Sequence, residues 1–217
     1  MPTTRSRLSR ASTSNISDAL DKLGLPGACE GIVPMVEGVR MIGPAFTAKY
    51  VPYDRKSPGT VGDFLDSVGR GKVVVIDNAG RTGCTVWGDI MTTYAVKKRL
   101  TGTLIDGVCR DIDGIRGFAY PVFARGHFMR TGKGRVQVES TEKPVMISGV
   151  KVRPGDLVVG DVNGVVVVPA ERADEVAQVS DGIAEAEEGI VEDIGRGVTL
   201  AEARKEHGYH TLQSKSK

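Results

Sequence analysis

The chain has 217 residues, and its 29 Lys and Arg residues nearly balance its 27 Asp and Glu residues. This length is enough for one sizeable core, and the charge balance excludes a broad basic field that would attract nucleic acid. Three cysteines without Cys-x-x-Cys spacing argue against a disulfide framework or a structural zinc site. No apolar stretch reaches signal-peptide or membrane-span length, so we expect a soluble, cytoplasmic protein without membrane contact.

The N-terminal segment combines a polar stretch with a first predicted helix. Residues 1–12 are rich in Ser, Thr and Arg, and we expect a flexible tail there. Apolar residues recur at helical spacing over 16–23, with Ser14 as the candidate N-cap and Gly24 after the end.

Strands are predicted on both sides of a short helix at 60–68. A strand region covers 40–51 and is interrupted at Gly43-Pro44. The apolar run 73–76 reads as a short buried strand that ends at the turn residues 77–80.

A βαβ unit is completed by the next two elements. Residues 89–100 can form a helix with Ile90, Tyr94 and Ala95 facing inward, and 103–105 form a second short strand. In a right-handed βαβ unit the helix begins at the edge to which the second strand returns. The segments after the two strands should therefore face each other.

The rest of the chain continues the α/β pattern. A short helix at 111–118 and a strand at 121–124 are followed by a Gly- and Val-rich region and a long helix after Pro169. Further strands are predicted at 144–147, 157–159 and 165–168. Gly182 and Gly189 would weaken the long helix, so it is expected to lean on a neighbour. We predict an α/β fold with a central sheet, one domain over 13–207 and a flexible tail over 208–217.

Two groups of candidate site residues meet at the shared edge of the βαβ unit. Gly88, Asp89, Ile90 and Met91 would present the free N–H groups of a helix N-terminus, which suit a carboxylate or phosphate. After the second strand, Arg110 supplies a guanidinium that grips a planar oxyanion, and Asp111 supplies a carboxylate able to hold a hard divalent cation. The alternative is that Asp89 is only a helix cap and Arg110-Asp111 an ordinary ion pair.

The spacing of these residues resembles that of a known enzyme family. Asp89 lies in the stretch Trp87-Gly-Asp-Ile-Met, and twenty residues separate it from Arg110-Asp111. This spacing is similar to the D-x20-R-D signature of the class II pyruvate aldolases. Those enzymes cleave 4-hydroxy-4-methyl-2-oxoglutarate and 4-carboxy-4-hydroxy-2-oxoadipate, and they share a family with the regulator of ribonuclease E activity A. Further matching stretches lie at 16–24, 42–47, 103–107, 121–124, 152–159 and 164–169.

The resemblance implies a swivelling α/β/α domain with a central mixed sheet, assembled into homotrimers or hexamers. It also implies a lyase that releases pyruvate from a small anionic 4-hydroxy-2-oxo acid and decarboxylates oxaloacetate as a side activity. Asp111 would hold Mg²⁺, or Mn²⁺ or another divalent cation, and Arg110 would stabilise the enolate. Asp89 would orient a water that removes the C4 hydroxyl proton.

One departure from the family pattern keeps a second function open. In the aldolases the signature continues with an acid at the third position after the Asp, where this chain has Gly114; the nearby acid is Asp113. The alternative is a non-catalytic regulator that binds and inhibits ribonuclease E. Retention of Asp89, Arg110 and Asp111 favours the enzyme, because a protein-binding regulator needs no complete enolate site.

Overall fold

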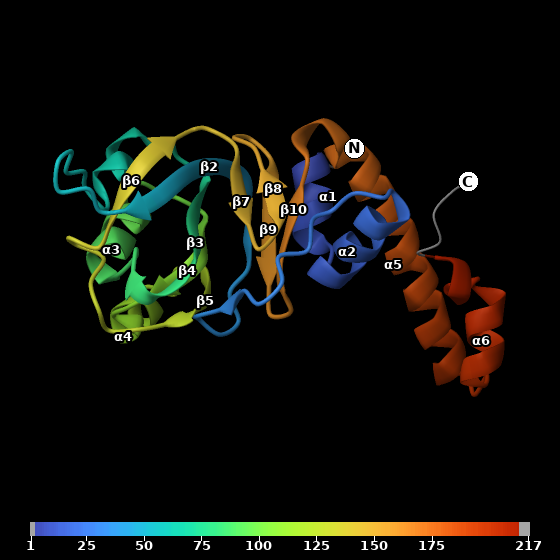
Figure 1. Cartoon of the computed structure of the whole chain (residues 1–217). Helices are drawn as coiled ribbons and strands as arrows, with labels where there is room; N and C mark the ends of the chain where they lie inside the picture. The colour runs from blue at the N-terminus through green and yellow to red at the C-terminus, as the bar shows by residue number, and fades with distance from the viewer. Residues whose placement is uncertain (1–2, 213–217) are drawn as a thin grey trace. The chain divides into compact units, whose positions relative to one another are not determined.

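The computed structural model describes residues 3–212, and their contacts group them into two compact units (Figure 1). One unit is Ala28–Ala170, and the other consists of the described parts of Met1–Gly27 and Glu171–Lys217. The division into one domain over 13–207 stays a prediction.

The unit Ala28–Ala170 is built on a mixed sheet. Its centre is formed by four parallel strands, β2 (Met41–Pro52), β3 (Val73–Thr85), β4 (Gly102–Cys109) and β5 (Val122–His127). Antiparallel strands β1 (Val33–Pro34), β6 (Val136–Thr141), β9 (Leu157–Asp161) and β10 (Gly164–Val168) extend it, in the order β1-β5-β4-β3-β2-β9-β10 with β6 also on β2. The predicted α/β class with a central mixed sheet is confirmed.

Two strands differ from their predicted form. β2 is not interrupted at Gly43-Pro44, because both residues pair with β9, at Val158 and Leu157. β3 does not end at residues 77–80, and its register with β4 shifts there instead. Ala79 and Gly80 have φ values of 51° and 67°, so these residues form an irregularity from which pairing resumes.

Each face of the parallel strands buries its own apolar cluster. Val74, Ile76 and Ile105 point to the cluster that includes α3 (Asp89–Lys97) and α4 (Ile112–Gly117). Val75 and Leu104 point to the other cluster, which is closed by a hairpin of β7 (Val145–Ile147) and β8 (Val150–Val152). Figure 1 shows α3 and α4 on one side of β3–β5 and this hairpin on the other.

The predicted inward face of α3 is partly wrong. Ala95 is fully buried, but Ile90 is 77% exposed. Ile90 lies in the first turn of the helix, where it lines a cavity instead of packing into the core. The short helix predicted at 60–68 is a 3-10 turn, η1 (Asp63–Ser67).

The second unit is helical and contains the long predicted helix as α5 (Ala173–Gly195). It also contains α1 (Thr4–Arg10), α2 (Thr13–Lys22), α6 (Leu200–Glu206) and the 3-10 turns η2 (Ala170–Arg172, at the unit boundary) and η3 (Tyr209–Thr211). Most of the predicted N-terminal tail is thus helical. Ser12, rather than the predicted Ser14, is the N-cap of α2. In the predicted C-terminal tail, residues 213–217 lie outside the described part of the chain.

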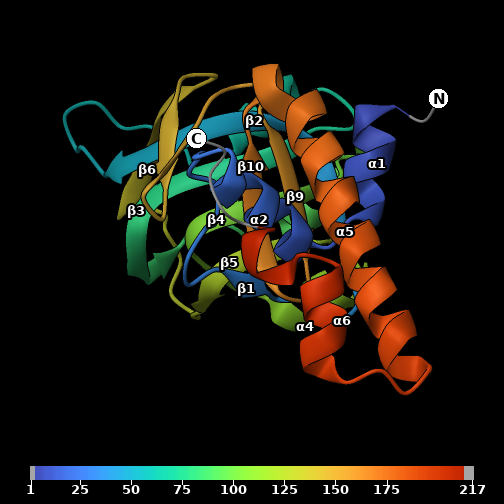
Figure 2. The ribbon, with the colours of Figure 1, turned by 90° about the vertical axis from the view of Figure 1, so that its right-hand side faces the viewer.

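The long helix α5 leans on α6, as its glycines predict (Figure 2). A Cβ at Gly189 would lie 2.3 Å from the His207 ring, so glycine permits the close approach. The His207 Nε2 atom lies 2.8 Å from Asp193 Oδ2. Hydrogen bonds from His207 and Arg196 lower the pKa of the Asp193 carboxyl.

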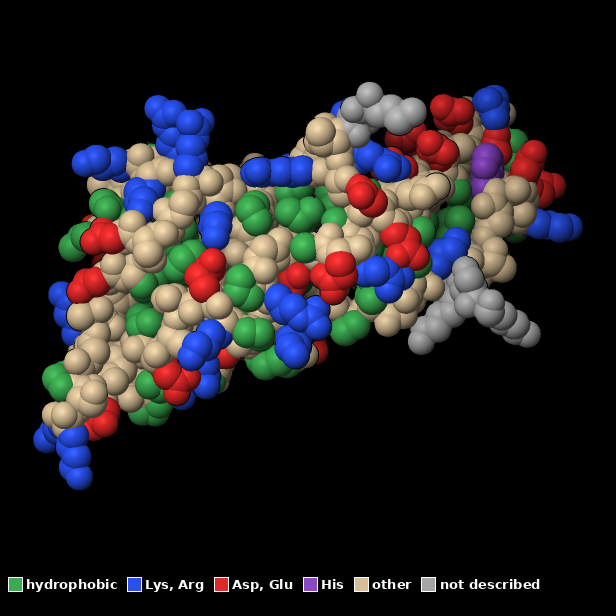
Figure 3. Space-filling model, turned by 90° about the horizontal axis from the view of Figure 1, so that it is seen from above, with side chains coloured by type: hydrophobic (Ala, Val, Ile, Leu, Met, Phe, Trp, Pro, Cys, Tyr) green, Lys and Arg blue, Asp and Glu red, His purple; other side chains and the backbone are tan. Residues whose placement is uncertain are grey.

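Charged side chains of both signs are interspersed on the face seen in Figure 3. Lys49 on β2 and Glu139 on β6 form an exposed ion pair, with Nζ and Oε2 2.7 Å apart and both side chains close to half exposed. Such pairs contribute little stability, because water solvates both partners.

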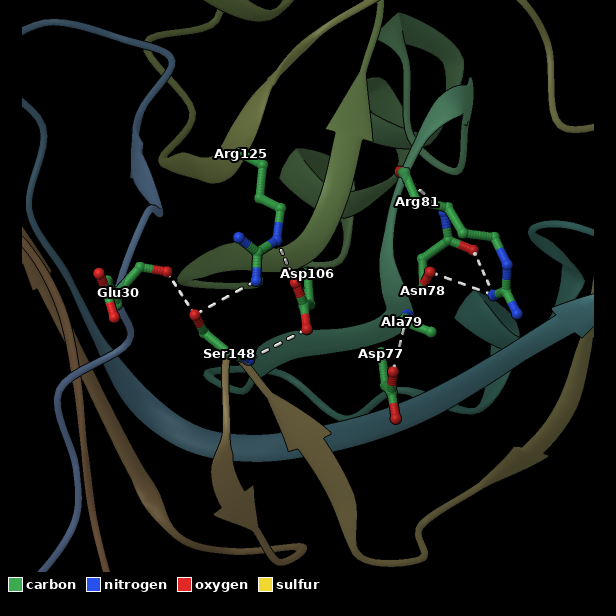
Figure 4. A network of polar contacts seen from close by, with 8 residues as sticks. All are labelled: Glu30, Asp77, Asn78, Ala79, Arg81, Asp106, Arg125 and Ser148. Atoms are coloured by element: carbon green, nitrogen blue, oxygen red, sulfur yellow. Dashed lines mark hydrogen bonds and ion pairs between the residues drawn. The ribbon is translucent and has the colours of Figure 1, made fainter.

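A polar row crosses the parallel strands near their carboxyl ends, with two buried aspartates and a partly exposed arginine (Figure 4). Asp77, Asp106 and Arg125 come from β3, β4 and β5, and Arg125 Nε donates to Asp106 Oδ1 at 2.5 Å. The Ser148 N–H, from the turn of the β7–β8 hairpin, donates to Asp106 Oδ2 at 3.0 Å, and Arg125 Nη2 donates to Ser148 Oγ at 3.2 Å. The row therefore ties the hairpin to the sheet.

Removal of Asp106 is expected to be costly, because it leaves the Arg125 charge and the Ser148 N–H without their buried partner. We expect Asp106→Ala to lower the free energy of unfolding by about 2 kcal/mol, because the Ser148 N–H loses its acceptor and the Arg125 charge is only partly solvated. Glu139→Ala, in the exposed pair with Lys49, should cost at most about 1 kcal/mol. Urea unfolding of both variants measures this, and equal losses would show that the row is no more important than a surface ion pair.

Candidate functional site

A cavity of about 350 Å³ lies where α3 begins and β4 ends. It belongs entirely to the unit Ala28–Ala170. All of the predicted site residues line it: Gly88, Asp89, Ile90, Met91, Arg110 and Asp111. The remaining walls are formed by Val61, Gly62, Asp63, Leu65, Asp66, Thr85, Val86, Trp87, Tyr94, Thr131 and Lys133. The two groups of residues that the βαβ argument predicts to face each other are therefore together in one cavity.

The helix side of the cavity is the first turn of α3. Gly88 occupies the N-cap position in an extended conformation and has no side chain to cap the helix. Asp89 is the first helical residue, and its Oδ1 accepts a hydrogen bond from the Ile90 N–H at 2.7 Å. One carboxylate oxygen of Asp89 is thus engaged with the first turn, but the N-cap position belongs to Gly88, so the alternative of Asp89 as the N-cap is wrong.

The strand side of the cavity is the turn from β4 into α4. Arg110 Nε and Asp111 Oδ2 are 3.3 Å apart, and each side chain is 36% exposed. Asp111 is the N-cap of α4, yet its side chain makes no capping hydrogen bond. Its φ of 57° is left-handed, a conformation that costs a non-glycine residue energy and is concentrated at functional sites.

Two glycines let the halves of the site approach each other. A Cβ at Gly88 would lie 2.6 Å from Asp111 Oδ2 and 3.4 Å from Arg110 Cγ. A Cβ at Gly114 would lie 2.8 Å from the Cβ of Asp89. The distances of 2.6 and 2.8 Å are too short for real Cβ contacts. A side chain at position 88 would therefore displace Asp111, and one at position 114 would displace Asp89.

The chemistry of this donor set fits a hard divalent cation held by few protein ligands. Across residues 3–212, no three His, Cys, Asp or Glu side chains are grouped in a way that could hold a metal ion. Mg²⁺ commonly keeps several waters and uses one or two carboxylates together with substrate oxygens. The Asp111 carboxylate makes no capping hydrogen bond and lies at the cavity against Gly88, which suits this mode of binding.

The sequence did not predict the wall formed by η1. Tyr94 Oη donates to Asp66 Oδ1 at 2.7 Å, and this hydrogen bond raises the pKa of Tyr94. Lys98 Nζ donates to the Leu65 carbonyl at 2.9 Å, which fastens η1 to α3. No local pattern in residues 61–66 signals this packing, which depends on contacts with a helix about thirty residues away.

Lys133 lies in a glycine-rich loop that closes the cavity at the end of β3. Thr85 N–H donates to the Arg130 carbonyl at 2.9 Å, and a Cβ at Gly132 would lie 2.4 Å from the Thr85 carbonyl oxygen. Glycine at 132 therefore allows the loop to lie against the strand. Gly132 and Gly134, which flank Lys133, mark this loop in the sequence.

The family of the chain follows from its similarity to known proteins. A family model for RraA-like proteins, described as Aldolase/RraA, matches residues 13–167. The chain belongs to this family, which confirms the resemblance found in the motifs.

Two relatives extend the comparison along the chain. Protein DlpA of Legionella pneumophila is 39% identical over 211 residues, which cover 96% of this chain but only 34% of DlpA. The chain therefore spans about a third of that relative's length. A Halalkalibacterium halodurans protein named "Putative 4-hydroxy-4-methyl-2-oxoglutarate aldolase" is 34% identical over 170 residues, or 76% of each chain. Relatives with this name support a carbon–carbon lyase at the level of the family.

Solved structures agree on the fold. A Pseudomonas syringae protein described as uncharacterized has a TM-score of 0.86 and 42% identity, covering 93% of this chain and 96% of its own. Streptomyces coelicolor RraAS2, described as an unusual member of the RNase ES inhibitor RraA protein family, has a TM-score of 0.75 and 27% identity over 90% and 97%. Within residues 3–212 no helix combines the length and the apolar character needed to cross a membrane.

The left-handed backbone of Asp111 makes a prediction about stability. Alanine at this position bears the strain of its Cβ and glycine does not, so Asp111→Ala should be less stable than Asp111→Gly by about 1 kcal/mol. Asp113, which has helical backbone in the first turn of α4, provides the matched control. There the order should reverse, with Asp113→Gly less stable than Asp113→Ala by about 1 kcal/mol. Urea unfolding of the four variants measures both differences, and the same order at both positions would contradict the assigned strain.

Proposed function

We propose that the protein is a divalent-metal-dependent pyruvate lyase that cleaves a 4-hydroxy-2-oxo acid, such as 4-hydroxy-4-methyl-2-oxoglutarate, into pyruvate and a second oxo acid. The observation that carries this proposal is the convergence of Asp89, Arg110 and Asp111 in one cavity beside a helix N-terminus. Relatives named as aldolases support the same class of reaction.

In this reaction the C3–C4 bond breaks and its electron pair passes to the pyruvyl half, which becomes an enolate. The C4 hydroxyl loses its proton and becomes the carbonyl of the second product, and protonation at C3 completes pyruvate. The site must therefore stabilise negative charge at one end of the broken bond and accept a proton at the other.

Arg110 and the start of α3 would bind the pyruvyl half. The N–H groups at the start of α3, other than that of Ile90, which donates to Asp89 Oδ1, are assigned to the substrate carboxylate, because a helix N-terminus favours anions. The Arg110 guanidinium would donate to the keto oxygen, where negative charge develops as the enolate forms. Asp111 would hold Mg²⁺, Mn²⁺ or another divalent cation, which when bound supplies Lewis-acid polarisation of that oxygen.

Asp89 is assigned to the proton of the C4 hydroxyl, through an oriented water. Its Oδ1 accepts from the Ile90 N–H, which fixes the carboxylate in place. Its Oδ2 is the atom assigned to that water. Loss of carbon dioxide from oxaloacetate gives the same enolate without removal of a hydroxyl proton, so decarboxylation is proposed as a side activity.

The alternative function is a regulator that binds and inhibits ribonuclease E. Similarity to RraAS2, whose description names an RNase ES inhibitor family, favours it. In the proposed enzyme the partners are a small anionic 2-oxo acid and further copies of the chain in a homotrimer or hexamer, with no role for nucleic acid.

Pyruvate release with and without Mg²⁺, measured by coupling to lactate dehydrogenase, tests the proposal. Asp111→Asn should abolish metal-dependent release while the fold remains, because Asn tolerates left-handed backbone but lacks the carboxylate charge. Asp113→Asn, an exposed change two residues away, should keep full activity. Activity that survives exhaustive chelation would exclude the metal-dependent class. Inhibition of ribonuclease E without any lyase activity would establish the regulator instead.

Kinetics on two substrates separate the roles of Arg110 and Asp89. Arg110→Lys keeps the charge but loses the planar pair of donors. It should lower kcat/KM for aldol cleavage and for oxaloacetate decarboxylation by similar factors, on the order of 10². Asp89→Asn should impair cleavage more than decarboxylation, because only cleavage requires removal of a hydroxyl proton. Equal losses in Asp89→Asn would mean that Asp89 has only a structural role.

A further inference from the structure

A buried hydrogen-bond chain lies directly behind the cavity, at the start of α3. Trp87 is 2% exposed and Thr92 is fully buried. The Trp87 indole N–H donates to Thr92 Oγ1 at 2.9 Å, and Thr92 Oγ1 donates to the Gly88 carbonyl at 2.9 Å. The Thr92 hydroxyl therefore acts as acceptor and donor at once.

Trp87 also holds the other half of the site. Its carbonyl accepts a hydrogen bond from the Arg110 backbone N–H at 3.0 Å. On its other side the indole ring stacks on the ring of Tyr120, with centroids 6.3 Å apart and planes 8° from parallel. The side chain is thus fixed by packing and by Thr92, while the backbone fixes Arg110.

We propose that Trp87 and Thr92 are positioning residues that set the distance between the N-terminus of α3 and the Arg110 guanidinium. The proposal rests on the proposed function insofar as these two groups bind the same pyruvyl half. The affinity for a planar oxyanion that contacts both groups depends on their separation, and small displacements in such sites cause large losses of binding and activity. Gly88 lies between the two halves of the site. Its carbonyl accepts the hydrogen bond from Thr92, and its missing Cβ leaves space for the Asp111 carboxylate.

The double role of the hydroxyl distinguishes three side chains at position 92. Serine retains both hydrogen bonds, whereas valine, with nearly the same shape as threonine, retains neither. In Thr92→Val the Trp87 N–H loses its buried acceptor, so the indole must shift to find another partner. Trp87 is the only tryptophan of the chain, so its fluorescence emission reports this shift directly.

A second buried threonine serves as the matched control. Thr47 is fully buried in β2, and its Oγ1 donates to the Lys143 carbonyl at 2.7 Å. It does not line the cavity. Thr47→Val therefore removes a buried hydroxyl hydrogen bond of the same kind without touching the site.

The experiment measures binding of oxalate, a planar dianion shaped like the enolate of pyruvate, by calorimetry of the full chain in Mg²⁺. We expect Thr92→Val to weaken oxalate binding on the order of 10-fold or more, with a shifted Trp87 emission. Thr92→Ser should bind within about threefold of the natural protein, because it keeps both hydrogen bonds. Thr47→Val should also bind normally, even where its thermal stability falls as far as that of Thr92→Val.

Each result decides the proposal. Unchanged oxalate affinity in folded Thr92→Val, or an equal loss in Thr47→Val, would overturn the positioning role, and so would a natural protein that does not bind oxalate. If the natural protein binds oxalate but releases no pyruvate from any substrate, the proposed function fails. The affinities of the variants still decide the positioning role in that case.

Discussion

The site depends on the close approach of two turns that follow neighbouring parallel strands. The Trp87 carbonyl and the Arg110 N–H join the turns by one backbone hydrogen bond, and Gly88 leaves the space that the Asp111 carboxylate occupies. A side chain at position 88 would force the turns apart or turn the carboxylate away. The absence of one Cβ thus places a carboxylate, a guanidinium and a helix N-terminus within one cavity.

The sheet topology explains why these groups meet at this edge. β3 and β4 are parallel neighbours, so the segments that follow them both begin at the carboxyl edge of the sheet. After the irregularity at Ala79-Gly80, β3 continues to Thr85, beyond the polar row of Asp77, Asp106 and Arg125. That row holds the hairpin on one face, while the longer strand carries the start of α3 to the cavity on the other. The polar groups that hold the hairpin therefore come earlier along β3 and β4 than the segments that form the cavity.

The sequence was sufficient to predict the parts of the site that depend on strand direction. The apolar run 73–76, the helix that begins at Asp89 and the Arg110-Asp111 pair together define the edge, and the structure brings them together as predicted. It was not sufficient for features set by tertiary contacts. The exposure of Ile90, the η1 wall and the left-handed backbone of Asp111 depend on where the helices lie, and helical periodicity carries no such information.

The position of Gly114 links the departure from the aldolase signature to the geometry of Asp89. The signature has an acid at this position, but here a Cβ would lie 2.8 Å from the Cβ of Asp89. With α3 and α4 this close, a side chain at 114 would meet the Cβ of Asp89, so the two helices would have to move to accommodate it. The proton chemistry assigned to this corner therefore falls to Asp89 alone, and a substrate that needs a second acid there would require the two helices to separate.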